Sequence, residues 1–128
     1  MDLGGTKFSG EIPSSLSNLQ HLTYLDISYN NFGGEISDLF DKLSKLEALY
    51  VSENNLVGQL PLSLFGLTQL SYLRCSVNKL VGPMPGKIRG ISNLINMDFF
   101  GNYLNGTIAQ WCFSLSSLLY LSLDGNKL

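Results

Sequence analysis

A 24-residue motif recurs through the chain without insertion or deletion, and it constrains the fold more than any other feature of the sequence. One copy runs from Leu22 to Ile36. Within each copy an asparagine follows an apolar residue by three positions and precedes another by two, and a glycine comes four positions after it. A fixed period of this length with this pattern predicts a leucine-rich solenoid. The recurring asparagines are Asn30, Asn54, Asn78, Asn102 and Asn126, and Thr6 takes their place in the first copy.

Each repeat divides into a strand and a return segment. Alternation of apolar and polar residues over 22–30 predicts a half-buried strand, and equivalent strands of successive repeats pair in parallel. The return segments place apolar residues three apart, which predicts one short 3₁₀ or α turn in each. We therefore expect an α/β fold, a curved horseshoe with a parallel sheet on its concave face and short turns on its convex side. The return segments are 13–19, 37–43, 61–67, 85–91 and 109–115.

The repeated asparagine and glycine each have a predicted structural role. An asparagine side chain offers two donors and an acceptor, and burying it unpaired is costly. We expect the stacked copies to bond to neighbouring turns as a ladder, with the loosest turn at Thr6 because threonine lacks the amide. The glycine permits a positive φ or close packing at the next bend.

Composition excludes several classes of protein. A content of 45% apolar and 14% charged residues is not that of a disordered chain, and a net charge of −2 gives no footprint for nucleic acid. No apolar run approaches the roughly 18 residues of a membrane span, and Asp2 follows Met1 where a signal peptide would begin. We expect residues 1–128 to form a single block that stops in mid-repeat at Leu128, and we expect it to self-associate through uncapped ends.

Signals of catalysis or metal binding are missing. The single histidine, His21, is predicted to be an exposed loop residue, and no zinc-spaced cluster accompanies it. The segment 82–88 lacks the spacing and the hydroxyl residue of a P-loop. Cys75 and Cys112 fall on opposite sides of a repeat, and we expect two buried free thiols. The sequence thus predicts a protein that is not an enzyme and that binds neither a cofactor nor a metal.

The concave face is the best candidate for function. Five of the six tyrosines fall on it, and tyrosine combines rigid contact area with a polar tip. An alternative is that tyrosine simply suits a pleated surface, and that Arg74 and Asp98 form only an exposed ion pair. Phe100, an exposed aromatic residue, favours binding. The candidate ligand-binding residues are Tyr24, Asp26, Tyr29, Tyr50, Tyr72, Arg74, Asp98, Phe100 and Tyr120.

The repeat pattern resembles the plant-type extracellular leucine-rich repeat of receptor-like proteins, receptor kinases and polygalacturonase-inhibiting proteins. Segments 10–13, 58–61 and 82–85 fit its GxIP motif, whereas Ser37 and Ala109 replace the proline. Segment 109–115 resembles receptor-like proteins linked to disease resistance. The resemblance implies a right-handed superhelix with a second, small sheet around the GxIP segments.

The same resemblance implies a function. We expect a fragment of the ectodomain of a plant receptor-like protein, on the extracellular side of the plasma membrane, that acts in defence or signalling. Its expected partners are a peptide, glycan or protein ligand and, as a further candidate, a co-receptor. The sequon Asn105-Gly-Thr107 is then a glycosylation site. The alternatives are a receptor-kinase ectodomain, a polygalacturonase-inhibitor-like regulator, or a truncated fragment without a function of its own.

Overall fold

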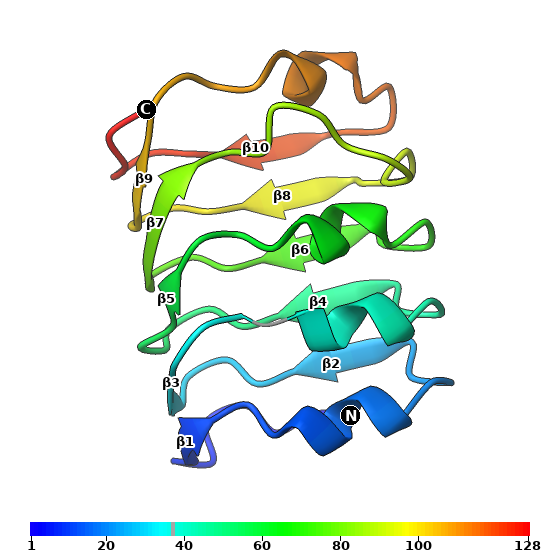
Figure 1. Ribbon diagram of the computed structural model, residues 1–128, viewed down its shortest axis with the longest axis vertical. Helices are drawn as coiled ribbons and strands as arrows, with labels where there is room; N and C mark the ends of the chain where they lie inside the picture. Colours follow the sequence, from blue (N-terminus) through cyan, green and yellow to red (C-terminus); the bar gives the residue numbers. More distant parts are fainter. Residues whose placement is uncertain (37) are drawn as a thin grey trace.

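The computed structural model describes residues 1–36 and 38–128, which form a solenoid of stacked repeats (Figure 1). Its main sheet is parallel, and equivalent residues of successive repeats face each other, as Leu25 faces Leu49. This arrangement confirms the predicted leucine-rich-repeat fold. We call the side of this sheet that faces away from the turns the concave face. In sheet order the five strands are β2 (Tyr24–Asp26), β4 (Ala48–Tyr50), β6 (Tyr72–Arg74), β8 (Asn96–Asp98) and β10 (Tyr120–Ser122).

Short 3₁₀ turns lie across the core from the main sheet (Figure 1). Pro13 and Pro61 precede two of them with φ of −67° and −71°, the value that the proline ring imposes. Ala109 adopts a φ of −64° in the same place, so the turn begins there without proline. The predicted role of Ser37 lies outside the described residues. The turns are η1 (Ser14–Asn18), η2 (Asp38–Lys42), η3 (Leu62–Gly66) and η4 (Gln110–Ser114).

The fourth return segment departs from the prediction, because residues 85–91 form no 3₁₀ turn. Gly86 and Gly90 lie within it, and glycine loses the most backbone entropy on entering a helical turn. Trp111 reaches across this segment from η4. Its Nε1 donates a hydrogen bond to the Pro85 carbonyl at 2.6 Å, and its ring meets that of Phe65 edge-on at 5.5 Å. The indole therefore ties η4 to both preceding repeats.

Smaller parallel sheets lie at the bends that precede the return segments. One pairs β1 (Ser9–Glu11) with β3 (Asn31–Gly33), and another joins β5 (Val57–Gly58), β7 (Lys79–Pro83) and β9 (Tyr103–Asn105). They lie around the GxIP segments, where the family resemblance placed a second sheet.

Gly58 shows why glycine recurs at this bend. Its φ is +78°, which L side chains rarely adopt, and a Cβ there would lie 2.8 Å from Cγ of Glu35 in the preceding repeat. The backbone angle therefore favours glycine, and the Glu35 side chain passes close to the bend.

The asparagines join successive repeats through their side-chain amides. Asn78, for example, accepts a hydrogen bond from the Leu56 N–H at 3.0 Å and donates to the carbonyls of Val51 and Cys75 at 3.0 and 3.3 Å. Asn30, Asn54, Asn102 and Asn126 make the same set of bonds one or more repeats away. At the first turn Thr6 substitutes a hydroxyl that donates to the Leu3 carbonyl at 2.7 Å.

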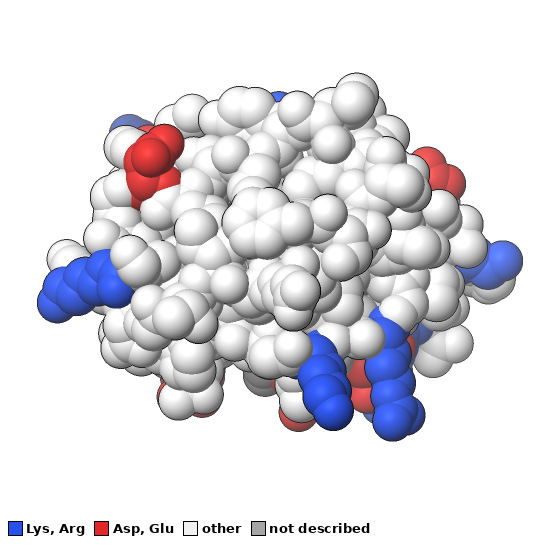
Figure 2. All heavy atoms as spheres, turned by 90° about the horizontal axis from the view of Figure 1, so that it is seen from above, with Lys and Arg blue, Asp and Glu red and all other residues white. Residues whose placement is uncertain are grey.

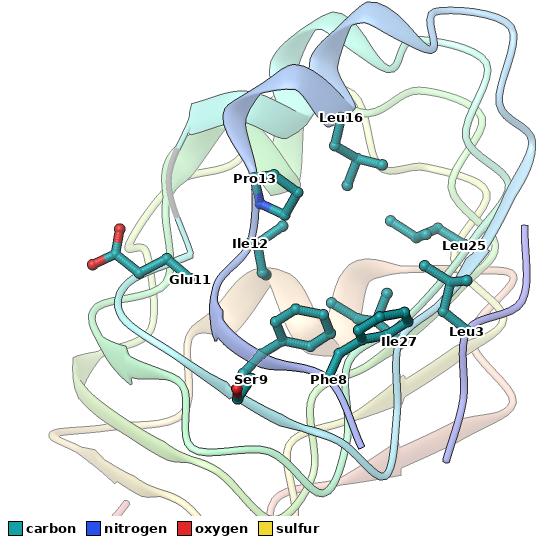
Figure 3. A pocket seen from close by; sticks show the side chains of 10 residues that line it. Leu3, Phe8, Ser9, Glu11, Ile12, Pro13, Leu16, Leu25 and Ile27 are labelled. Carbon is teal, nitrogen blue, oxygen red and sulfur yellow. The ribbon is translucent and has the colours of Figure 1, made fainter. Parts of the chain in front are cut away.

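The two ends of the solenoid expose repeat interior. At the N-terminal end an apolar hollow of about 300 Å³ opens between Leu3, Phe8, Ile12, Leu16 and Leu25 (Figure 3). Figure 2 looks down on the C-terminal end, where charged side chains lie around the rim and uncharged residues cover the middle.

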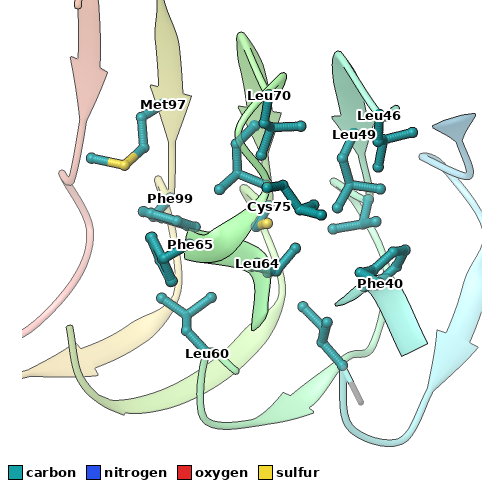
Figure 4. Close-up of a cluster of buried hydrophobic side chains, with 14 of the residues drawn as sticks. Phe40, Leu46, Leu49, Leu60, Leu64, Phe65, Leu70, Cys75, Met97 and Phe99 are labelled. Atoms are coloured by element: carbon teal, nitrogen blue, oxygen red, sulfur yellow. The ribbon is translucent and has the colours of Figure 1, made fainter. Parts of the chain in front are cut away.

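One continuous hydrophobic core runs between the main sheet and the turns (Figure 4). Leu49 and Met97 enter it from strands, and Phe40 and Phe65 from turns. Cys75 and Cys112 are both buried and free, and His21 is exposed, as predicted.

Candidate ligand-binding surface

The concave face carries one row of side chains in which large and small residues alternate, which we call the tyrosine row. Strand pairing places its members opposite one another in successive strands. Its tyrosines are 37–50% exposed, whereas Ala48 and Asn96 are at most 9% exposed. Exposed rings therefore alternate along this row with nearly buried residues. The row consists of Tyr24, Ala48, Tyr72, Asn96 and Tyr120.

A second row lies two residues further along each strand and carries the charged side chains. It consists of Asp26, Tyr50, Arg74, Asp98 and Ser122. Arg74 lies at its middle, with its guanidinium carbon 5.3 Å from the centre of the Tyr50 ring. Its Nε donates to Oδ1 of Asn96 at 3.2 Å. Arg74 thus reaches toward both flanking strands, and these contacts take the place of the ion pair with Asp98 that the sequence suggested. Oδ1 of Asp98 instead accepts the Phe100 N–H at 3.0 Å.

A polar hollow of about 290 Å³ opens beside this second row. Of the nine residues predicted to bind ligand, it brings together Asp26, Tyr29, Tyr50, Arg74 and Asp98. A pocket for a drug-sized ligand occupies roughly 300–1,000 Å³. The hollow therefore suits a side chain of a larger ligand.

The other four predicted residues lie outside the lining of this hollow. Tyr24 touches its edge, since its ring meets that of Tyr50 edge-on at 5.5 Å. Tyr72 and Tyr120 belong to the tyrosine row, and Phe100 is 46% exposed just beyond β8. The predicted set therefore forms two adjoining features of one face.

Sequence reasoning missed Glu53, which also lines the hollow. Glu53 and Tyr29 have φ of 55° and 56°, in the left-handed region, and this backbone conformation aims both side chains at the hollow. The equivalent position is glycine in three other repeats, at Gly5, Gly101 and Gly125. The glycine at this repeat position is the signal that the sequence offers. It indicates a left-handed backbone there, which a residue other than glycine at the same position also adopts.

The hollow is acidic on balance. Asp26, Glu53 and Asp98 supply three carboxylates against the single guanidinium of Arg74. Burial, followed by the nearby Asp26 carboxylate, raises the pKa of Tyr24 above its usual 10, so the phenol stays protonated and donates to Oδ2 of Asp26 at 3.4 Å. A ligand in this hollow therefore meets more carboxylate groups than positively charged groups.

Over residues 1–36 and 38–128, His, Cys, Asp and Glu side chains form no group of three that could hold a metal ion. In the same residues no helix has the length and apolar character needed to cross a membrane. Asn105, the asparagine of the sequon, is exposed at the end of β9, on the small sheet and away from the polar hollow.

Comparison with known proteins finds a leucine-rich-repeat match and similarity to solved ectodomains of plant receptors. The family described as leucine rich repeat matches residues 1–56, and no curated protein sequence matches the chain. The structure of the Arabidopsis receptor kinase HAESA, in complex with the peptide hormone IDA and the co-receptor SERK1, is similar with a TM-score of 0.95 and 35% identity. The match covers 98% of this chain and 21% of that one.

Two further solved structures are similar along most of the chain. The leucine-rich-repeat ectodomain of the receptor kinase GASSHO1/SCHENGEN3 from Arabidopsis thaliana, in complex with CASPARIAN STRIP INTEGRITY FACTOR 2, gives a TM-score of 0.88 at 34% identity over 93% of this chain and 14% of that one. The ectodomain of the Arabidopsis thaliana receptor kinase SOBIR1 gives 0.91 at 25% identity, over 98% and 68%. The chain thus spans about a fifth or less of the first two proteins.

Proposed function

We propose that this leucine-rich-repeat solenoid is part of the extracellular ectodomain of a plant cell-surface receptor and that it recognises a peptide on its concave face. The observation that carries the proposal is the continuous, in-register surface on which an exposed tyrosine row adjoins a charged hollow. Rigid aromatic side chains beside polar groups are enriched at recognition surfaces. HAESA, which is similar over nearly the whole chain, is in complex with a peptide hormone.

A receptor kinase has better support as the parent protein than the receptor-like protein that segment 109–115 favoured. HAESA, GASSHO1 and SOBIR1 are all receptor kinases. Trp111 in that segment also has a structural explanation, because its indole ties η4 to Pro85 and Phe65. In our proposal the module itself is non-catalytic, lies outside the plasma membrane, and works with a co-receptor as HAESA does with SERK1.

Selection from displayed peptides tests the proposal directly. Random 12-residue peptides are panned against the 128-residue chain, and the enriched sequences are titrated against a Tyr72→Ala/Phe100→Ala variant. Both side chains are exposed, so the variant keeps the core intact. Truncating buried contact aromatics typically costs 2 kcal/mol or more, so we expect affinity to fall by at least about tenfold.

The control is Tyr103→Ala, which removes an exposed tyrosine from the small sheet. Its affinity for the enriched peptides should equal that of the unmodified chain. Equal binding to the double variant would show that the concave face is not the site. Failure to enrich any peptide would overturn peptide recognition itself.

An extracellular location also predicts modification of Asn105. The side chain is exposed, and Thr107 supplies the hydroxyl that the sequon requires. We expect the chain, secreted from insect cells behind a heterologous signal peptide, to lose mass on treatment with an N-glycosidase. Thr107→Ala should abolish that loss. A secreted wild-type chain without glycan would contradict this part of the proposal.

A further inference from the structure

The exposed face of one small sheet carries the sequon at Asn105. We propose that this face is a platform for the sugar linked to Asn105, and that the first N-acetylglucosamine packs on the ring of Tyr103. The inference rests on the extracellular location in the proposed function, from which the glycan follows, and it adds where the sugar lies and which side chains hold it. In the linking step Nδ2 of Asn105 loses one proton and bonds to C1 of the sugar, and the pyrophosphate of a lipid-linked donor leaves.

Strand geometry places Tyr103 and Asn105 side by side. In β9 the two residues are exposed, and Leu104 between them is buried in the core. Residues two apart in a strand project from the same face, about 6.6 Å from each other. The ring of Tyr103 is 52% exposed. A sugar bonded to the Asn105 amide therefore reaches that ring.

Strand β7 extends the platform on one side of β9 (Figure 1). Its parallel pairing with β9 sets Val81 opposite Tyr103 and Pro83 opposite Asn105, and both are exposed. N-acetylglucosamine carries C–H groups on its ring and a methyl group on its acetyl arm. These groups gain free energy when they leave water for apolar and aromatic surface. The sugar thus finds aliphatic as well as aromatic contacts on this face.

Lys127 flanks the platform on the other side. A parallel bridge joins it to Asn105, and its Nζ lies 5.9 Å from the centre of the Tyr103 ring. An ammonium group at about this distance is attracted to an aromatic ring, so Lys127 restricts the rotation of the tyrosine. Its N–H groups are also available as donors to the hydroxyl and acetyl oxygens of a sugar.

Tyr103 and the sequon occur in the same repeat and in no other. Tyr103 is the one tyrosine that lies off the concave face, and its side chain takes no part in the hydrophobic core. The fold therefore does not account for an aromatic residue here, whereas a shared role with Asn105 does. The other repeats place polar residues at the equivalent position, namely Lys7, Asn31, Asn55, Lys79 and Lys127.

The chain's own sugar suits this platform better than a protein partner. The large apolar side chains on the face are those of Val57, Val81 and Tyr103, each 38–52% exposed. A specific protein interface buries about 800 Å² on each partner, which is more than these side chains supply. A glycan on Asn105 also blocks the approach of a partner to β9.

Thermal unfolding of two glycoforms tests the inference. The 128-residue chain is secreted from insect cells grown with a mannosidase inhibitor, and an endoglycosidase then trims the glycan to the single N-acetylglucosamine on Asn105. Thr107→Ala supplies the chain without sugar. We call the difference in Tm between the two the sugar increment, measured by circular dichroism at one protein concentration. We expect an increment of about 2 °C or more, because the sugar gains contacts only in the folded chain.

Substitutions of Tyr103 show whether its ring is responsible. The increment is measured for each variant between matching chains with and without Thr107→Ala. Tyr103→Ala should reduce it to less than about 1 °C, whereas Tyr103→Phe should keep it because the apolar ring remains. Phe113→Ala removes a ring that is 73% exposed on η4, outside the small sheet, and should leave the increment unchanged.

Proton NMR supplies a readout that needs no substitution. In the trimmed wild-type chain we expect nuclear Overhauser effects between protons of the sugar and ring protons of Tyr103. Their absence would overturn the inference, and this test holds even if Tyr103→Ala fails to fold.

The outcomes separate this inference from the proposed function. A glycosylated chain whose sugar increment is the same in Tyr103→Ala as in the wild type would refute the platform alone and leave the extracellular receptor standing. An increment lost equally in Phe113→Ala would also refute the platform, since the effect would not belong to this face. A secreted wild-type chain without glycan would overturn both the platform and the extracellular location.

Discussion

At the scale of single residues, each asparagine of the ladder satisfies several backbone groups with one side chain. Asn78 satisfies the Leu56 N–H and the carbonyls of Val51 and Cys75 while itself being 5% exposed. Asn78→Ala leaves these backbone groups without partners, and each buried unpaired group costs about 1–3 kcal/mol. We expect the free energy of unfolding in urea to fall by at least about 2 kcal/mol.

Asn55→Ala is the matched control for this prediction. Asn55 is the residue after the ladder position, and its side chain bonds only to that of Asn31 at the surface. Its loss should change stability by less than about 0.5 kcal/mol. Equal effects of the two substitutions would show that the ladder contributes nothing specific.

The two cysteines give stability a dependence on pH. Burial raises the pKa of the Cys75 thiol, and it raises that of Cys112 to about 11. In the unfolded chain both thiols ionise near the ordinary value of 9.0, whereas the folded chain holds them protonated. Their contribution to stability is therefore complete below pH 9 and is lost as the pH rises above it, by at most about 1.4 kcal/mol per pH unit for each thiol.

Urea unfolding at pH 8 and pH 10 measures this loss. A Cys75→Ala/Cys112→Ala variant is less stable at both values because it leaves space in the core. Its stability should nevertheless fall less between the two, since no buried thiol remains to be ionised. Parallel losses in the two proteins would contradict the assignment.

At the scale of elements, Trp111 compensates for the missing fourth turn. Its hydrogen bond to Pro85 and its edge-on contact with Phe65 join η4 to η3 across residues 85–91. Trp111→Phe keeps an aromatic ring but removes the donor. We expect a loss of about 1–2 kcal/mol in the free energy of unfolding, followed by circular dichroism.

Phe113→Ala in the same turn provides the comparison. Phe113 is 73% exposed, and its truncation should change stability by less than about 0.5 kcal/mol. If Trp111→Phe were as mild, the indole would not be the tie between these elements.

At the scale of the whole molecule, we expect the exposed ends to govern self-association. Phe8 is 48% exposed beside the apolar hollow at the N-terminal end, and the opposite end is uncharged over its middle (Figures 2 and 3). Repeat arrays require polar outer faces at their termini for solubility. We expect sedimentation velocity of the 128-residue chain to show a sedimentation coefficient that rises with concentration.

A charge placed on the exposed end should reduce this association. Phe8→Lys brings an ammonium group to the hollow, whereas Leu62→Lys changes an equally apolar residue, 67% exposed on the middle turn η3. Only the first should lower the concentration dependence. A wild-type chain that stays monomeric throughout, with cooperative unfolding, would refute self-association through the ends.

Much of this molecule follows from the period of its sequence. A repeat of constant length can pair equivalent strands in only one register, and the register places Tyr24, Tyr72 and Tyr120 in one row. Burial of Cys75 likewise follows from its place in an apolar column. These features depend on repeat position alone, and repeat position can be read from the sequence.

The tertiary structure decided what depends on distances between repeats and on backbone angles. Ala48 and Asn96 are nearly buried because larger side chains of adjacent strands surround them. Arg74 contacts Tyr50 and Asn96 on the two neighbouring strands. Glu53 lines the hollow because its backbone φ is positive. A glutamate in the sequence does not by itself indicate a positive φ. Side-chain reach and left-handed backbone are settled by packing between turns, and packing exists only once the repeats have stacked.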